Sequence, residues 1–253
     1  MTKQVSQKLL DLVENDKEHS CAGYGPDHVC VRAAGVADLP TEFGHFNIVA
    51  FWNNRDEKDH IAIVHGEVVG LENVPVRLHS ECLTGDALGS LRCDCRDQLK
   101  VSLQRIAEEP FGIVLYLRQE GRGIGLLNKI RAYQLQDGGL DTVEANLALG
   151  FRDDERDFAV AAHMLHSLGI KSVRLMTNNP KKVDELRRYD INVVERLPHI
   201  IPPNEHNRFY LETKSSRSGH WIDFEGHPHL PEQSDAVQVA GMDSTDVQKN
   251  QPG

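Results

Sequence analysis

Three cysteines are grouped in one short stretch of the chain, Cys82, Cys93 and Cys95, in the pattern C-x10-C-x-C. Thiolates are soft ligands that suit zinc, and three of them leave the fourth tetrahedral position open for water or substrate. No His or Cys follows at the spacing of a fourth ligand, which is typical of a catalytic zinc site. Cysteine can instead be buried as a small apolar residue, but the adjacent Glu81 and Asp94 are poor material for an apolar core. The sequence therefore predicts an open metal site.

A glycine-rich turn, residues 118–125 (RQEGRGIG), follows the apolar run 111–117 and precedes a helical pattern. Between a strand and a helix, such a turn lets backbone N–H groups approach a phosphate. The turn matches neither common nucleotide-binding pattern, and solvated surface charge is the default role of any single basic residue. Several basic side chains nevertheless gather here and at a second strand end, and they favour an anionic small substrate: Arg118, Arg122, Lys129, Arg131, Lys181 and Lys182.

The composition limits the class of protein. The chain has 253 residues, of which 40% are hydrophobic, enough for a packed core in one large domain or two small ones. The net charge of −10 argues against general nucleic-acid binding, because phosphate contacts need a basic face. Five cysteines, an odd number, argue against a disulfide framework. Because neither a signal peptide nor an apolar run of membrane-spanning length is visible, we expect a cytoplasmic protein without membrane partners.

Apolar periodicity predicts the elements that position these residues. Strands are expected at 46–52, from His60, from Val74, and at 111–117, 172–178 and 191–197. Helices are expected at 4–14, from Leu91 or Cys95 to Glu109, and at 126–136, 142–149, 155–168 and 180–189. The strand–helix–strand order after Phe111 indicates a partly parallel layer covered by helices. We therefore predict an α/β fold with three layers around a mixed sheet and a strand-rich N-terminal part.

Four long motifs resemble the signatures of bacterial GTP cyclohydrolase II: VRLHSECLTGDALGSLRCDCRDQL, LRQEGRGIGLLNKIRAYQLQD, DTVEANLALGF followed by DDERD, and TNNPKKV. The similarity covers about residues 29–221, and leaves 1–28 as an N-terminal appendage and 222–253 as a disordered tail. The resemblance implies an enzyme that opens the imidazole ring of GTP and releases formate and pyrophosphate, at the start of riboflavin biosynthesis. It also implies one zinc ion per subunit, magnesium with the triphosphate, and a homodimer.

The resemblance also assigns roles to individual residues. Cys82, Cys93 and Cys95 correspond to the zinc ligands, Asp154 to a proton acceptor, Arg156 to a nucleophile toward phosphate, and Tyr133 to an active-site tyrosine. The remaining matched positions correspond to residues that line the GTP site: Arg77, Leu78, His79, Ser80, Glu81, Gln98, Glu120, Gly121, Arg122, Thr142, Thr177 and Lys182.

Physical arguments refine these roles. Three thiolates leave a divalent ion with a formal charge of −1, so a protein base is needed, either Asp154 or Glu81, which adjoins a cysteine ligand. The guanidinium of Arg156 is a poor nucleophile because its pKa is above about 12, and it suits stabilisation of the leaving pyrophosphate instead. Glu120 is our candidate for accepting the guanine N1–H and 2-amino groups, which ATP lacks as a pair.

Other interpretations stay open at this stage. Asp153 or Asp154 could merely cap the helix expected at 155–168. Tyr133 could belong to the core, because it shares a helical face with Leu126 and Ile130. The whole chain could be a non-catalytic nucleotide-binding regulator, or a structural zinc module in which a fourth ligand closes the metal site.

Overall fold

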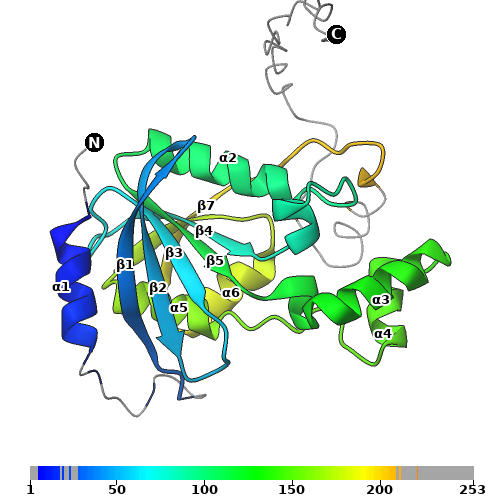
Figure 1. The fold of residues 1–253 in the computed structure, drawn as a ribbon, viewed down its shortest axis with the longest axis horizontal. Helices are drawn as coiled ribbons and strands as arrows, with labels where there is room; N and C mark the ends of the chain where they lie inside the picture. The colour runs from blue at the N-terminus through cyan, green and yellow to red at the C-terminus, as the bar shows by residue number, and fades with distance from the viewer. Residues whose placement is uncertain are drawn as a thin grey trace, which may run out of the picture. The chain divides into compact units, whose positions relative to one another are not determined.

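The fold is built on one mixed sheet of seven strands in the order β1-β2-β3-β5-β4-β6-β7 (Figure 1). The computed structural model describes residues 5–17 and 28–208, together with residues 19, 23, 211 and 221. Neighbours from β1 to β5 are antiparallel, whereas β5, β4, β6 and β7 run parallel to one another. The predicted α/β class with a mixed sheet is confirmed. The strands are β1 Val31–Thr41, β2 Gly44–Asn53, β3 His60–His65, β4 Val74–Ser80, β5 Gly112–Leu117, β6 Ser172–Met176 and β7 Asn192–Leu197.

Helices cover both faces of this sheet, which gives three layers. Helix α2 packs on one face, while α1, α5 and α6 contribute to the larger core on the other face (Figure 1). Helices α3 and α4 pack against each other. None of the helices in the described part of the chain combines the length and hydropathy that a membrane span requires. The helices are α1 Gln7–Asp16, α2 Cys95–Glu108, α3 Gly125–Asp137, α4 Thr142–Ala148, α5 Ala159–Ser167 and α6 Pro180–Arg188, with one π turn, η1 Leu83–Ala87, and one 3-10 turn, η2 Glu120–Gly123.

Strand β5 is central because both of its faces are buried. Ile113 and Leu115 point into the larger core, whereas Val114 packs with Leu103 and Ile106 of α2 on the opposite face. Alternate side chains of a strand point to opposite faces, so a continuous apolar run is what a doubly covered strand needs. The strand predicted at 111–117 is therefore confirmed.

The structure differs from the predicted elements in two places, strand β1 and the start of helix α5. Strand β1 was not predicted, because Gly35 and Pro40 interrupt its apolar pattern. It lies at the edge of the sheet and carries a bulge between Ala33 and Gly35, and an edge strand tolerates both residues. The helix predicted at 155–168 begins only at Ala159, whose backbone N–H is accepted by Asp157 at 2.8 Å, so Asp154 does not cap it.

The predicted helix at 4–14 forms as α1 and belongs to the same compact unit as the sheet, residues 1–222. Leu9 is buried in the larger core, and the Asp16 carboxylate accepts a hydrogen bond from the Ala33 backbone at 2.8 Å. The segment predicted as an appendage thus packs against β1 through its helix. The tail expected at 222–253 lies outside the described residues.

The sheet places three chain segments side by side. Strand β4 lies between β5 and β6 and is parallel to both. Because carboxyl ends of neighbouring parallel strands meet at one edge, the residues that follow Ser80, Leu117 and Met176 are brought together there. These are the cysteine stretch, the glycine-rich turn and the TNNPKKV motif.

Candidate functional site

The three cysteines converge beyond the end of β4. Cys82 precedes η1, and Cys93 and Cys95 lie at the start of α2. Their sulfur atoms all lie within 4.8 Å of one another, and Cys82 Sγ is 3.7 Å from Cys93 Sγ. A tetrahedral zinc with Zn–S bonds of about 2.3 Å places its sulfur ligands roughly 3.8 Å apart, so the donor set fits that ion. Within the described ranges, no fourth His, Cys, Asp or Glu belongs to this group.

The turn η1 wraps closely around these sulfur atoms, and Gly85 makes this possible. A Cβ atom at position 85 would lie 2.8 Å from Cys93 Sγ and 3.1 Å from Cys82 Sγ. Real Cβ atoms essentially never come within 3.0 Å of a neighbour, so the contact with Cys93 Sγ alone would force a shift. Packing therefore requires glycine at position 85, because the backbone there lies directly against the cysteine group.

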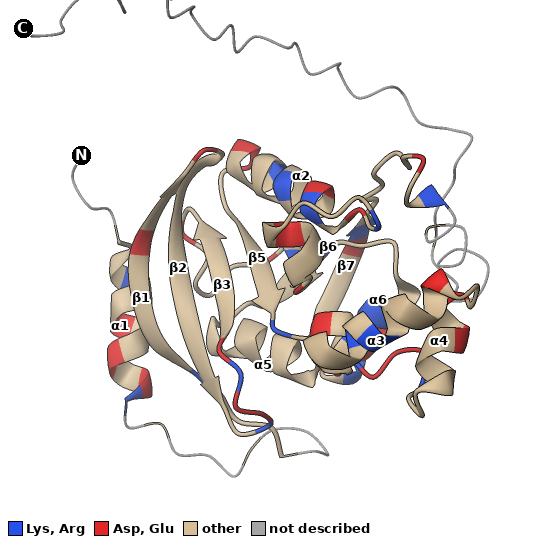
Figure 2. Ribbon diagram, turned by 45° about the vertical axis from the view of Figure 1, so that its right-hand side comes forward, with Lys and Arg blue, Asp and Glu red and all other residues tan. Residues whose placement is uncertain are grey.

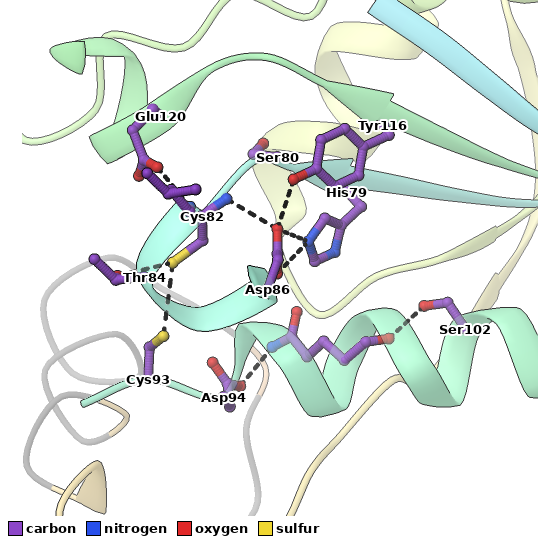
Figure 3. A network of polar contacts seen from close by, with 12 residues as sticks. His79, Ser80, Cys82, Thr84, Asp86, Cys93, Asp94, Ser102, Tyr116 and Glu120 are labelled. Carbon is purple, nitrogen blue, oxygen red and sulfur yellow. Dashed lines mark hydrogen bonds and ion pairs between the residues drawn. The ribbon is translucent and has the colours of Figure 1, made fainter. Parts of the chain in front are cut away.

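Asp86 fixes the beginning of the cysteine stretch (Figure 3). Its Oδ2 accepts hydrogen bonds from the Cys82 backbone N–H at 3.0 Å and from the Tyr116 hydroxyl at 2.9 Å. Both Asp86 oxygens also lie 3.1 Å from Nε2 of the buried His79, which stacks on Tyr116. Burial lowers the pKa of His79 despite its hydrogen bond with Asp86. Neither Asp86 nor Tyr116 was predicted from the sequence as a site residue.

Lys129 also contacts the cysteine group, although the sequence suggested that it supported a phosphate-binding turn. Its side chain is buried, and Nζ donates to Cys82 Sγ at 3.1 Å, Thr84 Oγ1 at 2.9 Å and Glu120 Oε1 at 2.7 Å. Burial lowers the pKa of Lys129, but the hydrogen bond with Glu120 and the charge of Cys82 raise it above its ordinary value overall. The second Glu120 oxygen accepts the Leu83 backbone N–H at 2.6 Å.

The three thiols titrate as a group. Hydrogen bonds from Cys93 and Cys95, followed by the charge of Lys129, lower the pKa of Cys82. The hydrogen bond with Cys82 raises the pKa of Cys93 to about 11. The ammonium of Lys129, which donates to Cys82 Sγ, therefore favours the thiolate form of this cysteine, and the thiolate is the form that binds metal.

A cavity of about 420 Å³ opens next to the sulfur atoms, a size within the usual range for small-molecule sites. Tyr133 lines it, with its hydroxyl 3.4 Å from Thr84 Oγ1 and its ring beneath the Arg92 guanidinium. Leu126 and Ile130 are exposed, so the alternative that places Tyr133 with them in a core is wrong. Sequence-predicted site residues that line this cavity are Ser80, Glu81, Cys82, Cys93, Cys95, Glu120, Gly121, Arg122, Tyr133, Thr142 and Arg156. Lys129, expected only as part of a phosphate-binding turn, lines it too, whereas Arg92, Asn146 and His206 were not predicted.

A second cavity, of about 90 Å³, adjoins the first and is rich in cations. Arg77 is buried there and donates to the Met176 carbonyl at 3.0 Å, and burial lowers its pKa to about 10, so it stays charged at neutral pH. Lys182 belongs to α6, a helix with several basic residues (Figure 2), and donates to the Leu78 carbonyl at 2.7 Å. The predicted residues that line only this cavity are Arg77, His79, Gln98, Thr177 and Lys182, and those shared with the first are Ser80, Cys95, Arg122 and Arg156.

Two predicted residues do not line either cavity with their side chains. The Leu78 side chain is fully buried in the larger core, which leaves only its carbonyl near the second cavity. The Asp154 carboxylate binds Arg156 in a bidentate ion pair, with Nε–Oδ1 and Nη2–Oδ2 distances of 2.8 and 2.7 Å. Burial raises the pKa of Asp154, but the hydrogen bonds and charge of Arg156 outweigh it and lower the pKa below its ordinary value.

The sequence of this chain is similar to those of known proteins. A model of the GTP cyclohydrolase II family matches residues 31–198. The GTP cyclohydrolase-2 of Picrophilus torridus is 57% identical over 184 residues, which cover 73% of this chain and 95% of that protein. The GTP cyclohydrolase-2 of Proteus mirabilis is 56% identical over 192 residues, or 76% of this chain and 96% of that protein. The riboflavin biosynthesis protein RibBA of Synechocystis sp. is 52% identical over 194 residues, which cover 76% of this chain and 35% of that longer protein. This chain therefore belongs to the GTP cyclohydrolase II family of enzymes.

Proposed function

We propose that this chain hydrolyses GTP at C8 of the guanine ring and releases formate and pyrophosphate. The product would be 2,5-diamino-6-hydroxy-4-(5-phosphoribosylamino)pyrimidine, and the reaction would be the first committed step of riboflavin biosynthesis. One observation carries the proposal: a three-cysteine group lines a nucleotide-sized cavity that shares a wall with a second, cation-rich cavity. A guanine at the cysteine end would have its phosphates directed toward the cations.

The cysteine group is the proposed zinc site. Zinc held there by Cys82, Cys93 and Cys95 would supply Lewis acidity and lower the pKa of a water ligand toward about 7. Three thiolates would make such an ion a weaker Lewis acid than neutral imidazole ligands would, so a carboxylate of the protein would be needed as a base. Glu81 lines the same cavity and directly precedes Cys82, which keeps it a candidate beside Asp154.

The ion pair between Asp154 and Arg156 affects which of the two carboxylates, Asp154 or Glu81, can accept the proton. While Arg156 is bound, the pKa of Asp154 is lowered and the carboxylate is a weak base at neutral pH. Arg156 also reaches toward the shared wall, where its Nη1 lies 3.4 Å from Ser80 Oγ. We propose that Arg156 transfers from Asp154 to the phosphates of GTP, which would raise the pKa of Asp154 and make it competent to accept a proton.

The second cavity is the proposed triphosphate site. Arg77 and Lys182 are cations held in fixed positions by the backbone carbonyls that they contact, and such preorganised charge stabilises a leaving pyrophosphate. Magnesium would accompany the triphosphate, because it binds phosphate oxygens together with water more readily than a closed protein cage.

Recognition of guanine by Glu120 stays a prediction. The hydrogen bonds that the Glu120 carboxylate already makes limit how it could accept the guanine donors. The carboxylate already accepts from Lys129, from the Gly121 backbone and from the Leu83 backbone. A carboxylate has about four acceptor positions, so roughly one remains for the two guanine donors. Glu120 would have to release one of these bonds to accept both.

One assay tests the proposal. The purified protein is incubated with GTP and magnesium, with and without a zinc chelator, and formate and pyrophosphate are measured. We expect formate only without chelator, no turnover of ATP, loss of formate in Cys93→Ser, and retention in Cys30→Ser, a buried cysteine outside the group. Nucleotide binding without turnover would instead favour a regulator, and tight metal binding without nucleotide binding would favour a structural zinc module.

The family relationship also supports a homodimer, which light scattering of the purified protein would test. A cytoplasmic location and the domain limits at residues 29 and 221 stay predictions from the sequence.

A further inference from the structure

Three consecutive residues at the first cysteine are held by one buried ion pair. Lys129 donates to the side chains of Cys82 and Thr84, while its partner Glu120 accepts the backbone N–H of Leu83. Lys129 and Glu120 are 2.7 Å apart, and their side chains are only 10% and 9% exposed. The pair comes from α3 and η2, elements that contain no cysteine of the group.

We propose that Lys129 is a positioning residue for Cys82, which orients the sulfur atom and limits the negative charge that it donates to a bound metal ion. This inference rests on the proposed zinc site and deepens it. An ammonium group has three N–H donors, and Cys82, Thr84 and Glu120 account for all three. Its place in a basic, glycine-rich motif suggested that Lys129 binds phosphate. Because all three donors are already used, Lys129 is not available to the phosphates.

The charge of the cysteine group explains how the hydrogen bond from Lys129 to Cys82 would favour metal binding. Three thiolates around a divalent ion leave a formal charge of −1 in a mostly buried group. A charged donor 3.1 Å from one sulfur stabilises that thiolate, and hydrogen bonds to charged groups are the strong ones. Residues that support metal ligands in this way typically contribute about 10- to 100-fold to metal affinity.

The test compares Lys129→Met with Lys100→Met, an exposed lysine of α2 that serves as the matched control. Zinc affinity is measured by competition with a chelator, and the cobalt(II)-substituted proteins are examined by absorption spectroscopy. We expect about 10- to 100-fold weaker zinc binding in Lys129→Met alone. We also expect its sulfur-to-cobalt charge-transfer band to move to longer wavelength, because a thiolate that has lost a hydrogen bond is a better electron donor.

Removal of Lys129 also leaves Glu120 as a buried charge without its partner, which could weaken folding and metal binding indirectly. The double variant Lys129→Met/Glu120→Gln removes both charges and keeps an acceptor for the Leu83 backbone. If Lys129 acts on Cys82, the double variant keeps the weak zinc binding and the shifted band.

Wild-type affinity and an unshifted band in the double variant, or in Lys129→Met itself, would overturn the inference. If the wild-type protein binds neither zinc nor cobalt, the proposed zinc site fails instead, whatever the variants do.

Discussion

Gly85→Ala is the sharpest test of the cysteine group, because the size of its effect can be worked out from distances in the structure. The new Cβ would lie 2.8 Å from Cys93 Sγ, whereas ordinary contact begins at 3.4 Å, so the sulfur must move by about 0.6 Å. Ligand distances at a metal site are held to within about 0.2 Å. Overpacking of this kind typically costs about 1–3 kcal/mol. If the metal-bound form alone bears that strain, zinc binds about 5- to 150-fold more weakly, at about 1.4 kcal/mol for each factor of ten.

The measurement is zinc affinity by chelator competition, together with thermal unfolding of the metal-free proteins. Gly35→Ala is the control, since no heavy atom lies within 4 Å of the Cβ it would add. Gly85→Ala should lose affinity while Gly35→Ala keeps it. Equal affinity in both variants would show that η1 does not confine the sulfur atoms as described.

Three further results are expected. Asp154→Asn should keep its zinc but lose about 10²- to 10⁴-fold in formate release, the usual contribution of a general base, and unchanged release at neutral pH would refute that role. Opening of the ring would leave a formamide, and a second hydrolysis at its formyl carbon, for which Tyr133 would position the intermediate, would release formate. Tyr133→Phe should therefore accumulate a formylated product detectable by mass spectrometry, whereas normal turnover would leave its hydroxyl without a catalytic part. Burial lowers the pKa of His163 to about 4, so between about pH 6.5 and 4 the unfolded chain binds a proton that the folded chain does not. The free energy of unfolding of the metal-free protein should therefore fall as the pH is lowered through this range, and His163→Gln should reduce the fall in urea titrations; an identical pH dependence in both proteins would contradict the argument.

The sequence was informative where burial leaves a strong pattern. Strand β5 could be predicted because a strand covered on both faces must be apolar throughout. Strand β1 could not, because Pro40 and Gly35 usually argue against a strand and only the tertiary structure reveals an edge with a bulge. The start of α5 was placed too early because acidic residues such as Glu155 resemble a first helical turn.

Spacing alone suggested that the cysteines meet, but it could not identify what surrounds them. Lys129 lies on α3 and contacts Cys82 only because η2 and α3 return to the end of β4. One signal was available: Lys129 precedes Tyr133 by four residues, so both lie on the same helical face. Asp86 had no such signal, because its partners His79 and Tyr116 come from two strands whose register the sequence does not encode.

The wall shared by the two cavities has a practical consequence for genetics. Arg156 and Arg122 line both cavities, so under the proposed placement of GTP the phenotype of a change at either residue cannot be attributed to one half of the reaction. Residues that face one side alone, Tyr133 for the first cavity and Thr177 for the second, separate the two. Suppressor screens should begin from those positions, where a compensating change can be traced to a single cavity.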